Sequence, residues 1–188
     1  MTRRLSHVIG FDDAPFARTH RGDVLIVGAL YSGLRLEGVL SAKVRRDGAN
    51  STSTLVRLLL QSRFKGHIQI IMLQGIAFAG FNVIDLHRLH ESLRIPAVVI
   101  ARKPPDLNAI KRALLHRVPG GKRKWALIER AGPMERVGGV YVQRTGLSLK
   151  QVDKLLGRFA IHSAIPEPLR VAHLIAGGIE TGESRHRP

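Results

Sequence analysis

The pattern of hydrophobic and polar positions has two regimes along the chain. Over 4–13, 24–31 and 36–44, apolar and β-branched residues form three short runs with short connections between them. Such runs are typical of strands, and short connections favour antiparallel pairing. Asp47-Gly48, a strong turn signal, follows the third run. The first quarter of the chain therefore predicts an antiparallel meander of three strands.

From residue 50 onward, the apolar positions recur mainly at helical spacing. This pattern predicts helices over 50–60, 81–93, 104–114, 124–131, 147–159 and 169–179, and short strands over 67–73, 96–101 and 140–143. Alternation of strand and helix from 67 to 101 implies parallel strands joined by right-handed crossovers. A meander that leads into a parallel half is an α/β architecture. Among common mixed sheets, the ribonuclease-H-like fold fits this order best.

The length and the termini bound the domain organisation. A chain of 188 residues suits one domain, and we expect that domain over 1–181, followed by a polar tail over 182–188. The longest apolar runs are far shorter than the roughly 20 residues that a membrane-spanning helix needs. The N-terminus has no apolar signal core. The sequence therefore predicts a cytoplasmic protein with no membrane partner.

The charge is one-sided. Lysine and arginine number 30 against 14 aspartates and glutamates, which gives a formal net charge of +16. Polyanions are the natural partners of such a chain, and no long amphipathic helix with an aromatic face favours a membrane surface instead. A charge excess that only keeps the protein soluble is the alternative. Nucleic acid is the better prediction, because solubility alone does not require so large an excess.

The residue types narrow the chemistry. Cysteine is absent, which excludes disulfides, thiolate zinc sites and cysteine nucleophiles. The nine histidines are scattered along the chain, so a zinc site is not expected. Any metal would be held by oxygen or imidazole ligands.

Two acids end the first predicted strand. Gly10 permits close backbone approach, and Asp12 and Asp13 follow where the strand emerges from the sheet. Carboxylates are the usual ligands of magnesium, and phosphodiester cleavage needs such a cation. Alternation along a strand sends the two side chains to opposite faces, so only one of them is expected to serve an ion directly. A simple strand-ending turn explains the same residues equally well.

A glycine-rich loop lies between the predicted strand at 67–73 and the next helix. In a parallel sheet, this junction lies on the ligand-binding side. Phe78 and Phe81 have rings that could stack on a base extruded from a duplex, Asn82 could read its edge, and Gly75 permits a tight turn after Gln74. Taken alone, the pattern favours a structural turn with two core phenylalanines.

Basic residues follow the strand at 96–101. Arg102 and Lys103 come directly after it, and Lys111, Arg112 and the 122–124 cluster lie further along. These side chains suit phosphate contacts, and Trp125 beside them suits stacking. A basic face that is merely solvated remains the alternative.

Four blocks of the sequence resemble a known family, the archaeal endonuclease dU proteins, which are distant relatives of endonuclease V. The blocks are IGFDDAPF from Ile9 to Phe16, LEGVL over 36–40, GIAFAGFNVID over 75–85 and IPEPLRVAHLI over 165–175. The resemblance implies a ribonuclease-H-like fold and magnesium-dependent or manganese-dependent cleavage of DNA near a deaminated base such as uracil or hypoxanthine. It implies that Asp12 is the metal carboxylate. It also implies that the 74–82 loop holds the lesion.

The chain departs from endonuclease V at two acids. Gln74 stands where endonuclease V has an aspartate, and the position of its glutamate falls near Asn50 or Ser51. A lone Asp12 offers magnesium little negative charge, so we expect weak metal binding. The missing ligands are replaced by one of the remaining acids or by a DNA phosphate, or else the protein binds without cutting. The acids considered are Asp13, Glu37, Asp47 and Asp85.

Three functions follow as hypotheses. The first is a nuclease with Asp12, Asp13 and Gln74 as catalytic residues and Asp12 as metal ligand. Its contacts to single-stranded or double-stranded DNA are expected from Phe16, Gly75, Phe78, Phe81, Asn82, Arg102 and Lys103. The second is a nucleic-acid-binding protein that keeps the nuclease fold without cutting, and the third is a scaffold for an acidic protein. The sequence leaves open which lesion is preferred and whether the chain forms a homodimer.

Overall fold

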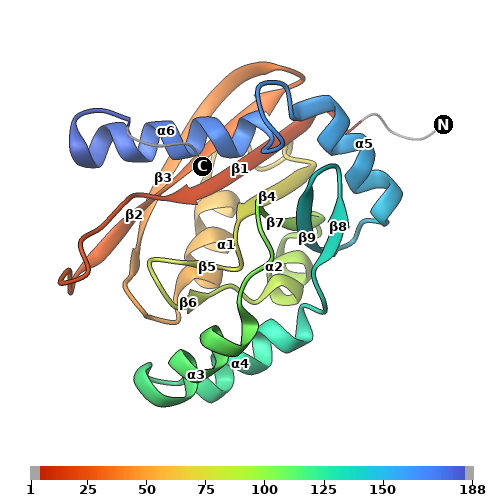
Figure 1. Ribbon diagram of the computed structural model, residues 1–188. Helices are drawn as coiled ribbons and strands as arrows, with labels where there is room; N and C mark the ends of the chain where they lie inside the picture. The colour runs from red at the N-terminus through yellow and green to blue at the C-terminus, as the bar shows by residue number, and fades with distance from the viewer. Residues whose placement is uncertain (1–4, 185–188) are drawn as a thin grey trace.

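The computed structural model describes residues 5–184 and contains a seven-stranded sheet with helices on both faces (Figure 1). The sheet has the order β3-β2-β1-β4-β7-β9-β8. Its strands are β1 (His7–Asp13), β2 (Asp23–Ser32), β3 (Arg35–Arg45), β4 (Ile70–Gln74), β7 (Ala97–Ala101), β8 (Glu135–Val137) and β9 (Val140–Thr145). A separate two-stranded hairpin joins β5 (Ala77–Phe78) to β6 (Asn82–Val83). The helices are α1 (Ser51–Gln61), α2 (Leu86–Leu93), α3 (Leu107–Arg117), α4 (Gly121–Arg130), α5 (Leu149–Phe159) and α6 (Glu167–Thr181).

The strand directions confirm the predicted mixed sheet. β1, β2 and β3 form the antiparallel meander, and β4 and β7 then add in parallel to β1. β9, for which no direction was predicted, pairs antiparallel with β7. Two helices separate these strands, and a connection of that length allows either direction. The carboxyl ends of β1, β4 and β7 therefore meet at one edge of the sheet.

Each face of the sheet has its own hydrophobic core. On one face, Phe11 and Leu73 pack with Leu55 and Leu59 of α1. On the other, α5 and α6 cover the alternate residues of the same strands, such as Met72. Full burial of a leucine side chain contributes about 1.5–3 kcal/mol relative to exposure, so both layers add substantially to stability. The alternation fixes which face each side chain at the strand ends will point to.

Helix α6 lies directly against β1, as Figure 1 shows. A Cβ atom at Gly10 would lie 2.4 Å from the carbonyl carbon of Pro168 and 2.6 Å from the amide nitrogen of Leu169. Only glycine therefore permits this approach. The close contact brings the middle of α6 over the last residues of β1.

The predicted helix over 81–93 is wrong at its start, because α2 begins only at Leu86. The residues before it form β6 and the cap of α2, where the Asp85 side chain accepts a hydrogen bond from the Arg88 amide at 3.0 Å. Strands β5, β6 and β8 were not predicted, since each has only two or three residues. Helix α4 begins at Gly121, before the predicted start at residue 124.

The predicted boundary at residue 181 stays a prediction. Helix α6 ends at Thr181, and Gly182 adopts a left-handed conformation with φ of 81° after it. Of the predicted tail, 185–188 lie outside the described residues, as does residue 4 of the first predicted strand. In the part of the chain that the structure describes, no helix is long and apolar enough to cross a membrane.

Candidate active site

Asp12 lies at the carboxyl end of β1, beneath α6. Its side chain is nearly closed off from solvent, with the whole residue 5% exposed. Oδ2 of Asp12 lies 2.8 Å from Nδ1 of His173, and Oδ1 accepts a hydrogen bond from the Asp13 amide at 2.9 Å. The side chain of His173 is 24% exposed. The pair therefore joins a buried carboxylate to an imidazole that reaches the surface.

No sequence pattern singled out His173. The pair spans 161 positions, and no local spacing predicts it. One signal was present, because α6 has an apolar face with Leu169, Ala172 and Ala176 buried, and His173 is a polar residue at its edge. Contact between this helix and β1 at Gly10 is what turns that position into a site.

The electrostatics of the pair favour a cation beside it. Burial raises the pKa of the Asp12 carboxyl, while the hydrogen bond to His173 acts in the opposite direction. That hydrogen bond raises the pKa of His173 above its usual value. Burial, together with the neighbouring Asp12 charge, raises the pKa of Asp13 to about 7. Two adjacent buried carboxyls are costly when both are charged, so a proton or a metal ion beside them is stabilising.

Gln74 lies beside Asp12 on the same face. The parallel register pairs Phe11 with Leu73, so the next residues of β1 and β4 are neighbours. Met72 packs into the core beneath α6, and alternation along β4 points Gln74 the same way. Oε1 of Gln74 is buried and has no hydrogen-bond partner within residues 5–184. The face beneath α6 thus brings together a carboxylate, an imidazole and an unsatisfied amide oxygen.

Asp13 points to the opposite face. Its Oδ2 accepts a hydrogen bond from the Ala79 amide at 2.7 Å. The neighbouring turn is held in the same way, because Oδ1 of Asp47 accepts from the Phe81 amide at 2.8 Å. Both acids therefore fix the backbone of the loop between β4 and α2. The expectation that Asp12 and Asp13 separate onto two faces agrees with these contacts.

The donor set suits at most a weakly held metal ion. Residues 5–184 contain no group of three or more acidic or histidine side chains that could hold a metal. Glu37 pairs with Arg35 at 2.5 Å and Asp85 with Arg130, so neither supplies a missing acid. Asp12 and the unpartnered oxygen of Gln74 remain as hard oxygen donors, which fits magnesium or manganese with most positions left to water or phosphate.

The residues of the 74–82 loop that were predicted to contact nucleic acid differ in burial. Phe78 and Asn82 are fully buried, which leaves neither side chain a surface for a base. Asn82 instead accepts from the Ser51 amide at 3.0 Å and donates to the Arg45 carbonyl at 2.8 Å. Its predicted contact with nucleic acid, like that of Phe78, is corrected to a structural role on the ground of this burial.

The other predicted contacts keep some exposure. Gly75 has φ of +80° at the turn after β4, and Phe81 is half-buried. Phe16 is half-buried as well, with the Arg46 guanidinium 5.5 Å from its ring centre. Arg102 and Lys103 are exposed and have no ion pair among the described residues.

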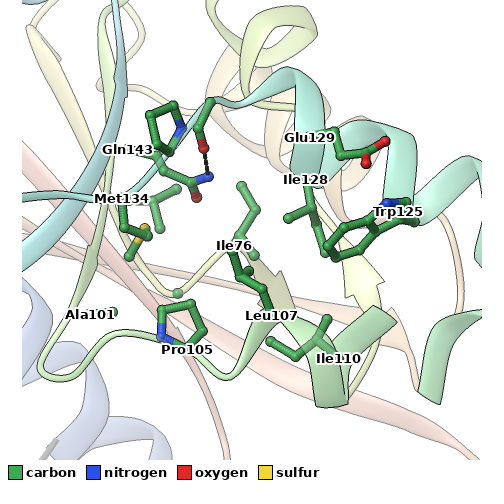
Figure 2. Close-up of a pocket in the computed structure, with 14 residues that line it drawn as sticks. Ile76, Ala101, Pro105, Leu107, Ile110, Trp125, Ile128, Glu129, Met134 and Gln143 are labelled. Carbon is green, nitrogen blue, oxygen red and sulfur yellow. Dashed lines mark hydrogen bonds between the residues drawn. The ribbon is translucent and has the colours of Figure 1, made fainter. Parts of the chain in front are cut away.

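An apolar pocket of about 310 Å³ opens beside the strand ends (Figure 2). Gly75 and Ile76, directly after Gln74, form part of its wall. Ala101, at the end of β7, lines it just before Arg102 and Lys103. The remaining walls come mainly from α3 and α4, with Leu107, Ile110, Trp125 and Ile128, and from Met134. Gln143 is a polar group in the wall, and its Nε2 donates to the Gly132 carbonyl at 2.6 Å.

Comparison with known proteins adds the family. A family model described as endonuclease dU matches residues 4–180. The chain belongs to the endonuclease dU family. A UPF0215 protein of Deinococcus radiodurans is 57% identical over 96% of this chain and 92% of its own length. Another UPF0215 protein, from Methanothermobacter thermautotrophicus, is 42% identical over 95% of this chain and 89% of its own length. The bacterial relative extends the predicted archaeal family.

Solved structures agree with the fold of an endonuclease dU protein. A protein of unknown function from Archaeoglobus fulgidus has a TM-score of 0.87 at 31% identity, covering 94% of this chain and 99% of its own. Endonuclease V of Ciona intestinalis, in complex with DNA containing an inosine followed by a ribo-adenosine, has a TM-score of 0.58 at 13% identity over 91% and 84%. The catalytic domain of human endonuclease V has a TM-score of 0.61 at 17% identity, covering 93% of this chain and 82% of its own. These likenesses confirm the predicted ribonuclease-H-like α/β fold.

Proposed function

We propose that this endonuclease dU protein is a metal-dependent nuclease that cleaves DNA beside a deaminated base. The carrying observation is the group beneath α6, where Asp12 pairs with His173 at 2.8 Å next to the unsatisfied Oε1 of Gln74. Gln74 Oε1 is one of the buried side-chain atoms that have no hydrogen-bond partner within residues 5–184, and it lies at the carboxyl ends of the parallel strands. The family name and the endonuclease V fold support a nuclease, and the substrate and the metal are our inference.

Asp12 and Gln74 are the residues that would hold magnesium or manganese. A bound divalent cation supplies neutralisation of phosphate charge and a lowered pKa of attached water. His173 is a positioning residue, because its Nδ1 hydrogen bond fixes the Asp12 carboxylate. Nε2 of His173 has no hydrogen-bond partner within residues 5–184, so it is free to exchange a proton with water near the scissile phosphate.

The apolar pocket is the place we assign to the extruded base. Its volume of about 310 Å³ has room for a purine or pyrimidine ring, and its walls of Trp125, Ile76 and Ile110 suit a flat aromatic ring. Arg102 and Lys103 follow directly after the wall residue Ala101 and suit the flanking phosphates. DNA, single-stranded or locally opened, is thus the proposed partner.

The test is a cleavage assay with matched oligonucleotides. Labelled strands that carry uracil, hypoxanthine or no lesion are incubated with the protein in magnesium, in manganese or in a chelator. We expect strand cleavage beside at least one deaminated base with a metal and none with the chelator. Equal cleavage of the undamaged strand would contradict the proposed selectivity.

A second candidate is a nucleic-acid-binding protein that does not cut. It is favoured by one observation, the single carboxylate beneath α6 where Gln74 stands beside Asp12. In the same assay, this candidate predicts salt-sensitive binding of every strand and no product with either metal. That result would replace the nuclease proposal.

A further inference from the structure

A second cavity, of about 330 Å³, lies on the other side of α4 from the apolar pocket. Trp125 and Ile128 of α4 face the apolar pocket, whereas Arg123 and Lys124 line this one. Its other walls are the turn at 47–49 and the start of α2. We call it the basic cavity, after the three cations in its wall, Arg88, Arg123 and Lys124.

Lys124 is the most unusual of these cations because it is buried. The residue is only 5% exposed, and its Nζ donates a hydrogen bond to the Asp47 carbonyl oxygen at 2.5 Å. Among the described residues, it has no carboxylate within ion-pairing distance. Burial lowers the pKa of Lys124, as expected for an ammonium without a full counter-charge. An anion in the cavity would supply that charge.

The acids around the basic cavity are already engaged. Asp47 accepts from the Phe81 amide at 2.8 Å and lies 3.3 Å from Nε of Arg46. Asp85 caps α2 and pairs with Arg130. Arg88 and Arg123 are exposed and form no ion pair within residues 5–184. Arg88 and Arg123 therefore have no counter-ion among these residues, and the Asp47 charge only partly offsets the effect of burial on the pKa of Lys124.

The backbone of α4 adds to the same preference. The helix begins at Gly121, and Gly120 before it provides no side-chain cap. The Gly121 amide donates to the Val118 carbonyl at 3.1 Å, and the remaining amide groups of this uncapped first turn point along the helix axis and favour an anion. Gly121 cannot be enlarged, because a Cβ there would lie 1.7 Å from the Leu114 carbonyl oxygen. The tight junction of α3 and α4 thus holds this helix end at the cavity.

We propose that the basic cavity binds a phosphate group, supplied by the backbone of bound DNA. This choice of source rests on the proposed function. It is supported by a short chain of contacts to the active-site edge, in which Lys124 bonds Asp47, Asp47 bonds the Phe81 amide, and Asp13 bonds the Ala79 amide. Asp13 directly follows Asp12 in β1, so a strand with one phosphate at Asp12 would cross the end of β1 to reach the 79–81 loop and the cavity on the opposite face.

The first arm of the test measures DNA binding by fluorescence anisotropy. The probe is a labelled single-stranded oligonucleotide in magnesium-free buffer, and the variant is Arg88→Ala with Arg123→Ala. The matched control is Lys150→Ala with Lys154→Ala, which removes two exposed charges from α5. We expect roughly tenfold weaker binding at low salt for the cavity variant, and a slope of log K against log salt reduced by about 0.7, the value for one lost phosphate. The control should stay within about twofold, since it alters only the general field.

The second arm separates DNA phosphate from free phosphate. Inorganic phosphate is titrated into the labelled protein, and the amide signals of Gly120, Gly121 and Lys122 are followed by NMR. Shifts in the wild type that vanish in the Arg88→Ala, Arg123→Ala variant support a phosphate site. If these shifts occur while DNA affinity and salt slope are unchanged, the site takes free phosphate and not the DNA backbone.

The proposal is overturned if phosphate causes no amide shifts and the cavity variant binds DNA as tightly as the wild type does. Failure of the nuclease function is recognised separately, because an Asp12→Asn variant keeps the basic cavity. If the wild-type protein cleaves no oligonucleotide while the cavity variant binds DNA more weakly than its control, the nuclease function is rejected. The phosphate site is then retained. Lys124 itself is not the primary variant, because it also fixes the turn at Asp47.

Discussion

The two faces of the sheet use their polar groups differently at the same strand ends. On the face opposite α6, Asp13 and Asn82 have their bonding capacity taken up by backbone amides and carbonyls of the neighbouring turns. On the face beneath α6, Gln74 keeps a buried oxygen without a partner, and Asp12 bonds a histidine that reaches solvent. Asp13 thus has a structural role, whereas its neighbour Asp12 keeps a contact with a partly solvent-exposed histidine. Polar groups that the fold does not satisfy are the better guide to chemistry.

Asn82→Ala is expected to have the largest effect on stability, and it tests whether this side chain has a structural role. Removal of the side chain breaks three hydrogen bonds and leaves the Ser51 amide without a partner, while the Arg45 carbonyl keeps the Gly48 amide and Asn50 Oδ1 keeps the Arg45 amide. We expect a loss of about 3 kcal/mol in the free energy of unfolding, because several buried groups lose hydrogen bonds together. Urea unfolding measures it. Asn108→Ala on the exposed side of α3 is the control and should change stability by less than about 0.5 kcal/mol.

Gly10→Ala tests the contact that creates the α6 face. The new Cβ would lie 2.4 Å from the backbone of Pro168, so α6 must shift away from β1. Overpacking of this kind costs about 1–3 kcal/mol, and we expect cleavage to fall as well, because His173 moves with the helix. Gly157→Ala in α5, where a Cβ meets nothing within 4 Å, should be neutral or stabilising. Unchanged activity in Gly10→Ala would separate the α6 contact from the chemistry.

Glu167, at the start of α6, gives a pH-dependent prediction. Hydrogen bonds from Arg170, with a further one to His162, hold the pKa of this carboxyl below its usual value. A lowered pKa means that the pair stabilises the fold above about pH 4.5, and that this contribution is lost as the pH falls through the folded value. Glu167→Gln should therefore cost about 1–2 kcal/mol at pH 7.

The same variant should differ less from the wild type as the pH falls below 4. Thermal unfolding across a pH series checks this convergence. A gap between the two proteins that stays constant down to pH 3 would contradict the assigned ion pair.

Asp13→Asn is expected to have the smallest effect. An asparagine keeps an oxygen that can accept from the Ala79 amide and removes a carboxyl whose pKa burial raises to about 7. We expect stability within about 1 kcal/mol of the wild type, since a buried charge is replaced by a neutral group of the same shape. Cleavage should remain within about tenfold of the wild type. A loss of cleavage as complete as that in an Asp12 variant would break the distinction between the two faces.

The sequence predicted most of the sheet, because its strands and helices differ in period and have clear turn signals between them. It also assigned Asp12 and Gln74 to one hypothetical site, and both residues lie at the carboxyl ends of strands that pair in parallel. Contacts between distant segments could not be predicted from the sequence. No local pattern indicates that His173 pairs with Asp12, or that Asn82 bonds the Ser51 amide, the Arg45 carbonyl and the Asn50 side chain. The antiparallel pairing of β9 with β7 likewise joins segments that lie about 40 residues apart, and no local pattern predicted it.

The most direct test of the account compares Asp12→Asn with the wild type on a labelled oligonucleotide bearing uracil or hypoxanthine. Single-turnover cleavage in magnesium or manganese is measured at protein concentrations that bind all of the DNA, with affinity measured in parallel. The account predicts that Asp12→Asn binds as the wild type does but cleaves at least about a hundredfold more slowly, because the carboxylate bonded to His173 is gone. Cleavage at the wild-type rate would contradict it.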